Sequence, residues 1–336
     1  MTQYWFAAST EEFPPSQMLE QARLAEVCGF DGLGASDHFA PWWPEGQASQ
    51  AWVFLGALGQ VTSLPLGTGV TPVIHHYHPG HIAQAWMSLA ELYPGRVWLG
   101  VGSGEALNEV PLGLDWPEPA EMLDRFDKGL EAITRLWDGE TVTMDGGWFR
   151  LKNAKLYTRA AERPRLYVSA FGPKAAKIAA KYADGLWTLG DPEKAPKIIE
   201  AYRAAGGGGE IILQSGFHLA EDEAGAIAAT KKWKATQLPE SYLRDFHDPA
   251  EMLAKADAEV SDEEFAKQGF IVGADAAEHV ERIREIEGLG ATIVCLQLIG
   301  DLDPMGSIER YGSDVLPALR QGRQPPRFQV PADARR

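Results

Sequence analysis

Short apolar runs rich in β-branched and aromatic residues alternate along this chain with segments whose apolar residues recur every three or four positions. The first pattern is typical of buried strands and the second of amphipathic helices. The runs predict eight strands, at residues 4–8, 32–36, 64–70, 97–102, 165–170, 185–189, 211–219 and 292–298. The clearest helical faces are those of Met18, Ala22 and Ala25, of Met122, Phe126, Leu130, Ile133 and Trp137, and of Val280, Ile283 and Ile286.

Eight strands alternating with helices fit one (β/α)8 TIM barrel with insertions better than an open sheet. The length of 336 residues alone would favour two domains, but barrels of this kind reach that size as one domain. We therefore predict a single barrel domain over residues 1–323, followed by a loosely held tail at 324–336. Three stretches interrupt the alternation and are predicted to be insertions: 39–51, 140–163 as a small hairpin, and 237–275.

The charge balance narrows the range of partners. Forty-seven Asp and Glu residues against 31 Lys and Arg leave a formal charge of −16, which repels phosphate backbones and anionic membranes. We expect neither a nucleic-acid nor a membrane partner. No signal-peptide pattern or long apolar run is found, so we expect a cytoplasmic protein. The two cysteines, Cys28 and Cys295, predict no disulfide framework and no cysteine metal site.

The first candidate for chemistry follows the second predicted strand, in Ser36-Asp37-His38-Phe39-Ala40-Pro41-Trp42. Active sites of (β/α)8 barrels lie at the C-terminal ends of the strands. A histidine there can accept the proton that an alcohol loses as its carbon gives up a hydride. The alternative is a histidine that caps a loop. Asp37 should project to the opposite face of the extended chain and cannot simply orient His38.

A second candidate follows the fourth strand, in the glycine-rich stretch that ends in Glu105. Alternating glycines let a ring or a phosphate approach the backbone, but the Gly-x-Gly-x-x-Gly spacing of dinucleotide sites is absent. If burial raises its pKa, Glu105 could stay protonated and donate to a ring nitrogen. A glutamate that interacts with the start of a helix is the alternative.

Weaker signals come from two other strand ends. Gly67-Thr68-Gly69-Val70-Thr71-Pro72 ends the third strand and predicts either a bulge or a wall for a flat ligand. Ser169-Ala170-Phe171-Gly172-Pro173 could offer free helix amides to a phosphate. The histidines at 75, 76, 78 and 81 lack the spacing of a metal site, so no metal is predicted.

Several ordered motifs resemble those of the luciferase-like F420-dependent oxidoreductases, and most of all the F420-dependent glucose-6-phosphate dehydrogenase group. Beside the motifs already quoted, the resemblance rests on Tyr77-His78-Pro79, Ile82-Ala83-Gln84-Ala85, Tyr93-Pro94-Gly95-Arg96-Val97 and Gly102-Ser103-Gly104-Glu105-Ala106-Leu107-Asn108-Glu109. It covers nearly the whole chain and is densest over residues 1–190. The resemblance implies coenzyme F420, a 5-deazaflavin that exchanges a hydride with a substrate carbon at C5. It also implies a homodimer.

The resemblance further implies a role for each matched residue. His38 would be the base, Trp42 would steady the charged state, and Glu105 would donate a proton on the other side of the ring from the base. Glu11 matches another acidic residue of the pocket. Gly69 and Val70 match a bulge with a non-prolyl cis peptide behind the ring. The remaining matched cofactor contacts are Asp37, Gly104, Asn108, Ala170, Phe171 and Gly172.

The chain departs from that group where its members bind the phosphate of the substrate. An acid, Asp191, follows Thr188 where a lysine is expected, and only Arg244 and Lys267 could substitute. Because charge-assisted contacts hold a phosphate, their loss favours an uncharged alcohol or sugar, or a differently held sugar phosphate. Two alternatives stay open: an FMN-dependent luciferase-like monooxygenase, and a barrel that binds without catalysing.

Overall fold

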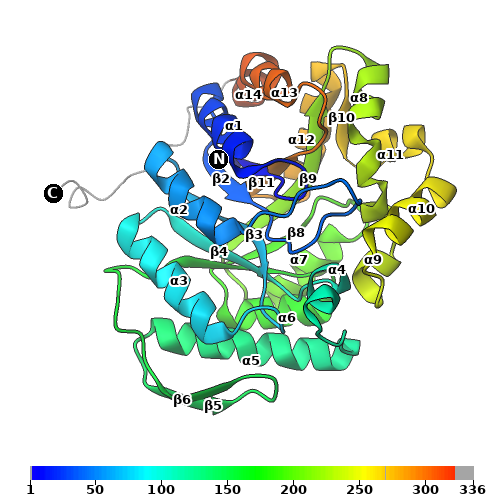
Figure 1. Cartoon of the computed structure of the whole chain (residues 1–336). Coiled ribbons are helices and arrows are strands. Elements are labelled where there is room, and N and C mark those ends of the chain that lie inside the picture. The colour runs from blue at the N-terminus through cyan, green and yellow to red at the C-terminus, as the bar shows by residue number, and fades with distance from the viewer. Residues whose placement is uncertain (1, 269, 322–336) are drawn as a thin grey trace.

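Within residues 2–268 and 270–321, which the computed structural model describes, eight parallel strands close into a barrel (Figure 1). In barrel order they are β1 (Gln3–Ala8), β2 (Gly32–Ala35), β3 (Leu66–Pro72), β4 (Val97–Gly102), β7 (Arg165–Ser169), β8 (Gly185–Leu189), β9 (Glu210–Leu219) and β11 (Ile293–Leu298). Pairing of β8 with β9 and of β11 with β1 completes the ring.

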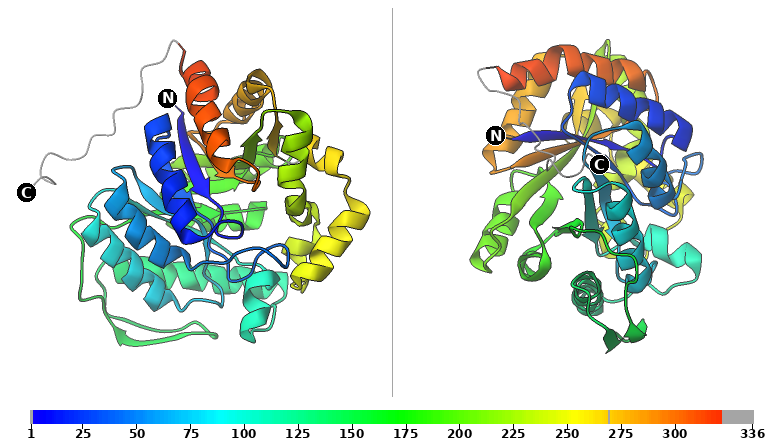
Figure 2. Two further views of the ribbon diagram at one scale, coloured as in Figure 1. Left: turned by 45° about the horizontal axis from the view of Figure 1, so that its top comes forward. Right: turned by 90° about the vertical axis from the view of Figure 1, so that its left-hand side faces the viewer.

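Helices surround the barrel on its outer side (Figure 2). They are α1 (Pro15–Cys28), α2 (Ala51–Val61), α3 (Pro79–Leu92), α5 (Pro119–Trp137), α6 (Pro173–Tyr182), α7 (Ala195–Ala204), α12 (Ala276–Gly288), α13 (Pro304–Arg310) and α14 (Leu316–Arg320), with a π-helical turn, η3 (Tyr311–Val315), before α14. Among the described residues, no helix combines the length and apolarity needed to cross a membrane.

The predicted (β/α)8 barrel is confirmed, and no end of its eight strands differs by more than two residues from the prediction. The helical faces are confirmed too: Phe126, Leu130 and Ile133 of α5 are fully buried. Of the two cysteines, Cys28 is partly buried and Cys295 lies inside the barrel. The predicted boundary at residue 323 and the tail at 324–336 lie outside the described residues.

Large and small residues complement each other in the barrel interior. Trp98 points inward from β4 while Val97 and Leu99 face the helices, as the two-residue period of a strand requires. Inside, the indoles of Trp5 and Trp98 stack with ring centroids 4.1 Å apart. A Cβ added at Gly32 of β2 would lie 2.8 Å from the Trp5 ring. The glycine on the neighbouring strand therefore makes room for the indole.

The predicted insertions differ in structure. Residues 140–163 contain the expected hairpin, β5 (Val142–Asp145) paired with β6 (Arg150–Ala154), which lies against α5 at the bottom of Figure 1. Residues 39–50 form no helix or strand.

The third insertion is mostly helical. After α8 (Glu223–Thr230) come η2 (Lys231–Gln237), α9 (Glu240–Leu243), α10 (Pro249–Glu259), α11 (Asp262–Gln268) and a short strand, β10 (Ile271–Gly273). The sequence prediction missed β10, which pairs with the last three residues of β9 beyond the part that faces β8. The apolar run of residues 270–272 was the available signal. Residues 231–268 are called the cap segment below.

Candidate functional site

The side chains of His38, Glu11 and Glu105 meet at the C-terminal end of the barrel. His38 Nε2 lies 3.4 Å from Glu11 Oε1 and 3.5 Å from Glu105 Oε2. The side chains of His38 and Glu105 keep 12% and 19% exposure, while Glu11 is almost fully buried. The structure thus brings together residues from the loops after β1, β2 and β4. A base and an acid were expected on separate sides of a ring, but here they are in direct contact.

The carboxylates around His38 control its charge. Burial by itself would lower the pKa of His38, but the carboxylates of Glu11, Glu105 and Asp37 outweigh it and raise the pKa above its ordinary value of 6.5. His38 is therefore a stronger base than a free imidazole. The carboxylates also stabilise the imidazolium that forms when it accepts a proton.

Asn108 positions both His38 and Glu105. Its Nδ2 donates to Glu105 Oε2 at 3.1 Å and lies 3.4 Å from His38 Nδ1. Its Oδ1 accepts a hydrogen bond from the backbone of Phe39 at 2.8 Å. Asn108 belongs to the short helix α4 (Ala106–Glu109), which begins directly after Glu105. This amide connects the loop after β2 to the loop after β4.

Burial raises the pKa of Glu105, and Glu11 raises it further, while His38 and Asn108 act in the opposite direction. The net shift is upward, so the carboxyl of Glu105 retains its proton at higher pH than an exposed glutamate. This is the condition under which a carboxyl can serve as a proton donor near neutral pH. The alternative of a glutamate at a helix start is compatible with the same position, because Glu105 directly precedes α4. Its side chain makes no cap hydrogen bond to the helix.

Glu11 is fixed by the loop after β1. Its Oε2 accepts hydrogen bonds from the hydroxyls of Ser36 and Thr10. Only Oε1 is directed at His38. This arrangement leaves one carboxylate oxygen of Glu11 for the imidazole.

Asp37 is directed away from His38, as the alternation of an extended chain predicts. Its carboxylate accepts hydrogen bonds from Trp52 Nε1 at 2.8 Å, Thr71 Oγ1 at 2.7 Å and Tyr77 OH at 3.2 Å. The side chain is buried and ties the end of β2 to α2 and to the end of β3. Its predicted cofactor contact stays a prediction.

The end of β3 is irregular at the predicted place. The peptide bond between Gly69 and Val70 is cis, and the register with β4 shifts between Thr68 and Thr71. A Cβ at Gly69 would lie 2.5 Å from the Trp187 ring, and one at Gly102 would lie 2.6 Å from Val70. Gly69, which was predicted to belong to a bulge or a ligand wall, is thus also required by packing inside the barrel.

The loop after β7 leaves the first turn of α6 open. Gly172 precedes α6 without a side-chain cap, and a Cβ added there would meet nothing within 4 Å. Ala170 is buried, whereas Phe171 is 54% exposed. Free amides at a helix start suit an anionic group, as the sequence predicted.

A row of rings crosses the mouth above His38. The His38 and Trp42 rings have centroids 5.5 Å apart, Trp42 and Tyr242 follow at 5.8 Å, and Tyr242 and Phe171 at 5.7 Å. Tyr242 comes from α9 of the cap segment. The sequence did not indicate a role for Tyr242, because no local pattern places it beside a residue two hundred positions earlier in the chain.

The three residues predicted to bind substrate are not brought together with His38. Thr188 is buried, and it lies on the opposite face of β8 from Trp187, which points into the barrel. Arg244 is exposed, after α9. Lys267 lies in α11, but its side chain is outside the described part of the structure.

The four histidines after β3 have separate surroundings: His75 contacts Arg125 of α5, and His81 is exposed in α3. His78 Nδ1 accepts a hydrogen bond from Gly80 at the start of α3, and His76 stacks on Tyr77. Among the described residues, no group of three or more His, Cys, Asp or Glu side chains could hold a metal ion.

The family of the chain follows from comparison with known proteins. A model of the luciferase-like monooxygenase family matches residues 2–292. The chain belongs to this family. The resemblance drawn from the motifs is thereby confirmed at the level of the luciferase-like fold.

Named relatives within the luciferase-like family refine this assignment. An F420-dependent glucose-6-phosphate dehydrogenase of Microbacterium testaceum is 37% identical, over 95% of this chain and 97% of the relative. One of Nakamurella multipartita is 38% identical, over 94% and 96%. A structure of an F420-dependent secondary alcohol dehydrogenase in complex with an F420-acetone adduct is 33% identical, covers 95% of this chain and 99% of that protein, and has a TM-score of 0.88.

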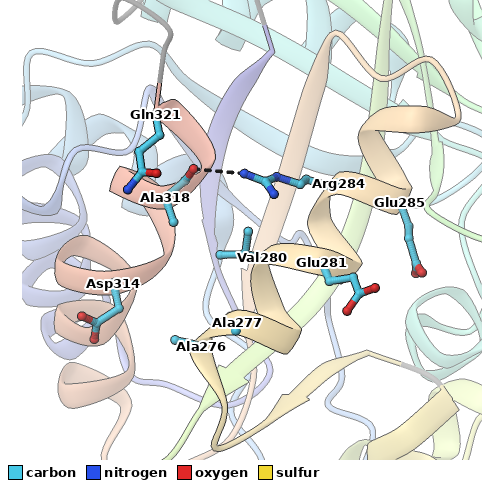
Figure 3. A pocket seen from close by; sticks show the side chains of 9 residues that line it. All are labelled: Ala276, Ala277, Val280, Glu281, Arg284, Glu285, Asp314, Ala318 and Gln321. Carbon is cyan, nitrogen blue, oxygen red and sulfur yellow. Dashed lines mark hydrogen bonds between the residues drawn. The ribbon is translucent and has the colours of Figure 1, made fainter.

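A groove of about 860 Å³ lies elsewhere on this luciferase-like barrel, between α12 and the C-terminal helices (Figure 3). Arg284 crosses it and donates to the carbonyl of Ala318 at 3.3 Å. Its lining comes from helices on the outside of the barrel and includes none of the strand-end residues described above.

Proposed function

We propose that this protein is an F420-dependent dehydrogenase that transfers a hydride between an alcohol carbon and the deazaflavin. The observation that supports it most strongly is the contact of His38 Nε2 with two carboxyls at the barrel mouth. An F420-dependent glucose-6-phosphate dehydrogenase shares more than 30% of the sequence, and an F420-dependent secondary alcohol dehydrogenase shares both that much of the sequence and the fold. A homodimer is proposed on the resemblance alone, and a cytoplasmic location on the pattern of the sequence.

The residues at the mouth fit an F420 cofactor. Its anionic tail requires donors, and the uncapped start of α6 at Gly172 offers backbone amides with open space beside them. Lys174 and Lys177 are exposed in the first two turns of the same helix and add positive charge to an acidic protein. The residues that would hold F420 are therefore those of the loop after β7, together with Gly69, Val70, Gly104 and Asn108.

The roles of the protein groups follow from their charges. When bound, F420 supplies a carbon that accepts or returns a hydride. His38 Nε2 accepts the hydroxyl proton of the alcohol as the substrate carbon is oxidised. Glu11 stabilises the resulting imidazolium from 3.4 Å. Burial raises the pKa of Glu105, and its carboxyl holds the proton that is needed together with the hydride when the cofactor is reduced. Trp42 packs beside His38 and excludes water from it.

We propose an uncharged alcohol or sugar as the substrate, rather than a sugar phosphate. Two lysines of the cap segment are engaged in ion pairs: Lys232 with Asp301 at 2.7 Å, and Lys234 with Asp257 and Asp262. After β8, Lys194 is 3.5 Å from Asp191. Cations that are already paired contribute less to holding a phosphate dianion. The ring of Tyr242 offers the substrate an apolar surface instead.

Cofactor choice is the first test. The protein is titrated with F420 and separately with FMN, and binding is followed by fluorescence quenching. We expect saturable quenching of F420 at micromolar protein and a much weaker response to FMN. Tight FMN binding without an F420 response would favour a flavin-dependent monooxygenase. Binding of neither would favour a barrel without catalytic function.

Substrate choice is the second test. Reduction of F420 is followed with secondary alcohols, aldoses and glucose 6-phosphate at the same concentration. We expect uncharged alcohols or aldoses to give the higher kcat/KM, by about 10-fold or more, because one charge-assisted hydrogen bond to a phosphate contributes about 1.5–3 kcal/mol. A higher kcat/KM for glucose 6-phosphate would contradict the proposed substrate class and leave the proposed cofactor untouched.

A further inference from the structure

A second glutamate in the loop after β1 takes no part in the function proposed above. Glu12 follows Glu11, but its carboxyl is directed at the cap segment and at the loop after β11. Its Oε2 accepts hydrogen bonds from the indole Nε1–H of Trp233 at 3.1 Å and from the backbone N–H of Gly300 at 2.8 Å. Its Oε1 is shielded from solvent and has no hydrogen-bond partner among the described residues. One carboxyl oxygen thus joins the loop after β1, the loop after β11 and η2 of the cap segment.

An ion pair lies next to this link, and it is more open to solvent. Lys232 Nζ is 2.7 Å from Asp301 Oδ2, but each of the two side chains is more than a third exposed. Exposed ion pairs contribute little to stability. A buried N–H group that loses its acceptor is costly by comparison. The hydrogen bond from Trp233 to Glu12 is therefore the firmer of these two links between the cap segment and the barrel.

Trp233 connects this link to the aromatic side chains beside His38. Its ring meets that of Trp43 edge-on, with centroids 5.4 Å apart. The preceding residue, Trp42, belongs to the same apolar cluster, and its ring centroid lies 5.5 Å from that of His38. Tyr242 of the cap segment contacts Trp42 at 5.8 Å. The position of the cap segment therefore decides which surface Trp42 and Tyr242 present at the mouth.

The carboxyl of Glu12 is mostly neutral near pH 7. Burial raises the pKa of Glu12 from 4.5 to about 8, and Asp301 raises it further, while the two hydrogen bonds and Lys232 act in the opposite direction. A neutral carboxyl still accepts both hydrogen bonds through its carbonyl oxygen. Glutamine has the same shape and an amide oxygen, so it is a close substitute for Glu12 at this pH.

We propose that Glu12 is a positioning residue, which holds Trp233 and with it the cap segment so that Trp42 and Tyr242 stay in place beside His38. It acts through these aromatic side chains and not on the reacting atoms. The apparent affinity for a substrate falls when the binding surface is in place in only a fraction of the molecules. This inference rests on the proposed function, in which the same aromatic surface contacts the alcohol.

The kinetic test compares Glu12→Leu, which has no acceptor, with Glu12→Gln, which keeps one. In Glu12→Leu the N–H groups of Trp233 and Gly300 lose their acceptor, so KM for the alcohol should rise about 10-fold while kcat falls less than about threefold. Glu12→Gln should stay within about twofold of the parent KM at pH 7, because its amide oxygen accepts both hydrogen bonds. Glu20→Leu, on the exposed side of α1, is the matched control. A normal KM in Glu12→Leu would overturn the proposal.

Trp233→Phe removes the same hydrogen bond from the other side and keeps an aromatic ring. By itself it should also raise KM, and it serves if Glu12→Leu folds poorly. In the double variant the two increases in KM should not multiply, because each substitution removes the same hydrogen bond. Increases that do multiply would show that Glu12 does not act through Trp233.

The indole N–H signals in an NMR spectrum of the protein without cofactor, isotope-labelled at the tryptophan nitrogens, test the same link. The signal of Trp233, identified by its loss in Trp233→Phe, should shift and exchange faster with solvent in Glu12→Leu, and stay near its parent position in Glu12→Gln. The signals of Trp42 and Trp43 should shift in Glu12→Leu and not in Glu20→Leu. Unchanged tryptophan signals in Glu12→Leu would overturn the proposal. Failure of F420 turnover in the parent would instead contradict the proposed function, and the indole signals would still show whether Glu12 positions these side chains.

Discussion

Replacing His38 with alanine should lower kcat for alcohol oxidation by about 10²–10⁴-fold, the range expected when a general base is removed. F420 binding, measured by fluorescence quenching, should remain nearly intact, because the imidazole of His38 is not among the groups proposed to hold the cofactor. His81→Ala removes an exposed histidine at the start of α3 and is the matched control. Unchanged turnover in His38→Ala would remove His38 from the role of base.

The same residue sets an acid limit on the rate. A base must be neutral to accept a proton, so oxidation should become faster as the pH rises through the pKa of His38, which lies above 6.5. Glu11→Gln removes one of the carboxylates that raise this pKa, and the acid limb should then move to lower pH. An acid limb that stays in place in Glu11→Gln would show that His38 does not control it.

Replacing Glu105 with glutamine should lower kcat by a similar factor of about 10²–10⁴, since the amide has no proton to transfer in place of the carboxylic acid. Glutamine keeps the size of the side chain and can still accept the hydrogen bond from Asn108 Nδ2. The loss should therefore appear in kcat and only weakly in cofactor affinity.

A second signature separates loss of the acid from general damage at the site. In its donating form Glu105 is protonated and uncharged, so Glu105→Gln should leave the acid limb set by His38 in place, whereas general damage at the site would move it. Glu121→Gln, on the exposed side of α5, serves as a control for the loss of one surface charge. A variant with normal kcat would exclude Glu105 as the proton donor.

The alternation of apolar runs and helical faces was sufficient to predict the barrel. Each strand of the ring carries its own signal, because a parallel strand buried on both faces is apolar throughout. The hairpin could be predicted from the turn residues at Asp145-Gly146-Gly147. The short strand β10 was missed because it depends on pairing with the far end of β9.

The candidate site, like the fold, could be predicted from the sequence only in part. The positions of His38 and Glu105 at strand ends could be predicted, because in a barrel every strand ends at the same mouth. Their direct contact could not, since it depends on Asn108, which joins the two loops through hydrogen bonds. The local i,i+4 spacing of Glu105 and Glu109 was visible in the sequence. Only the structure shows that the carboxyl of Glu109 is fully buried and has no hydrogen-bond partner within the described part of the chain.

The sequence by itself determined the fold, the strand-end location of the chemistry and the family. All three depend on the local periodicity of apolar residues and on the residue types found at the C-terminal ends of the barrel strands. The tertiary structure alone decided which charges touch, that Tyr242 covers Trp42, and that Lys232 and Lys234 are paired with acids. Such contacts join residues far apart in the chain, and their electrostatic consequences depend on distance and burial, which no local pattern encodes.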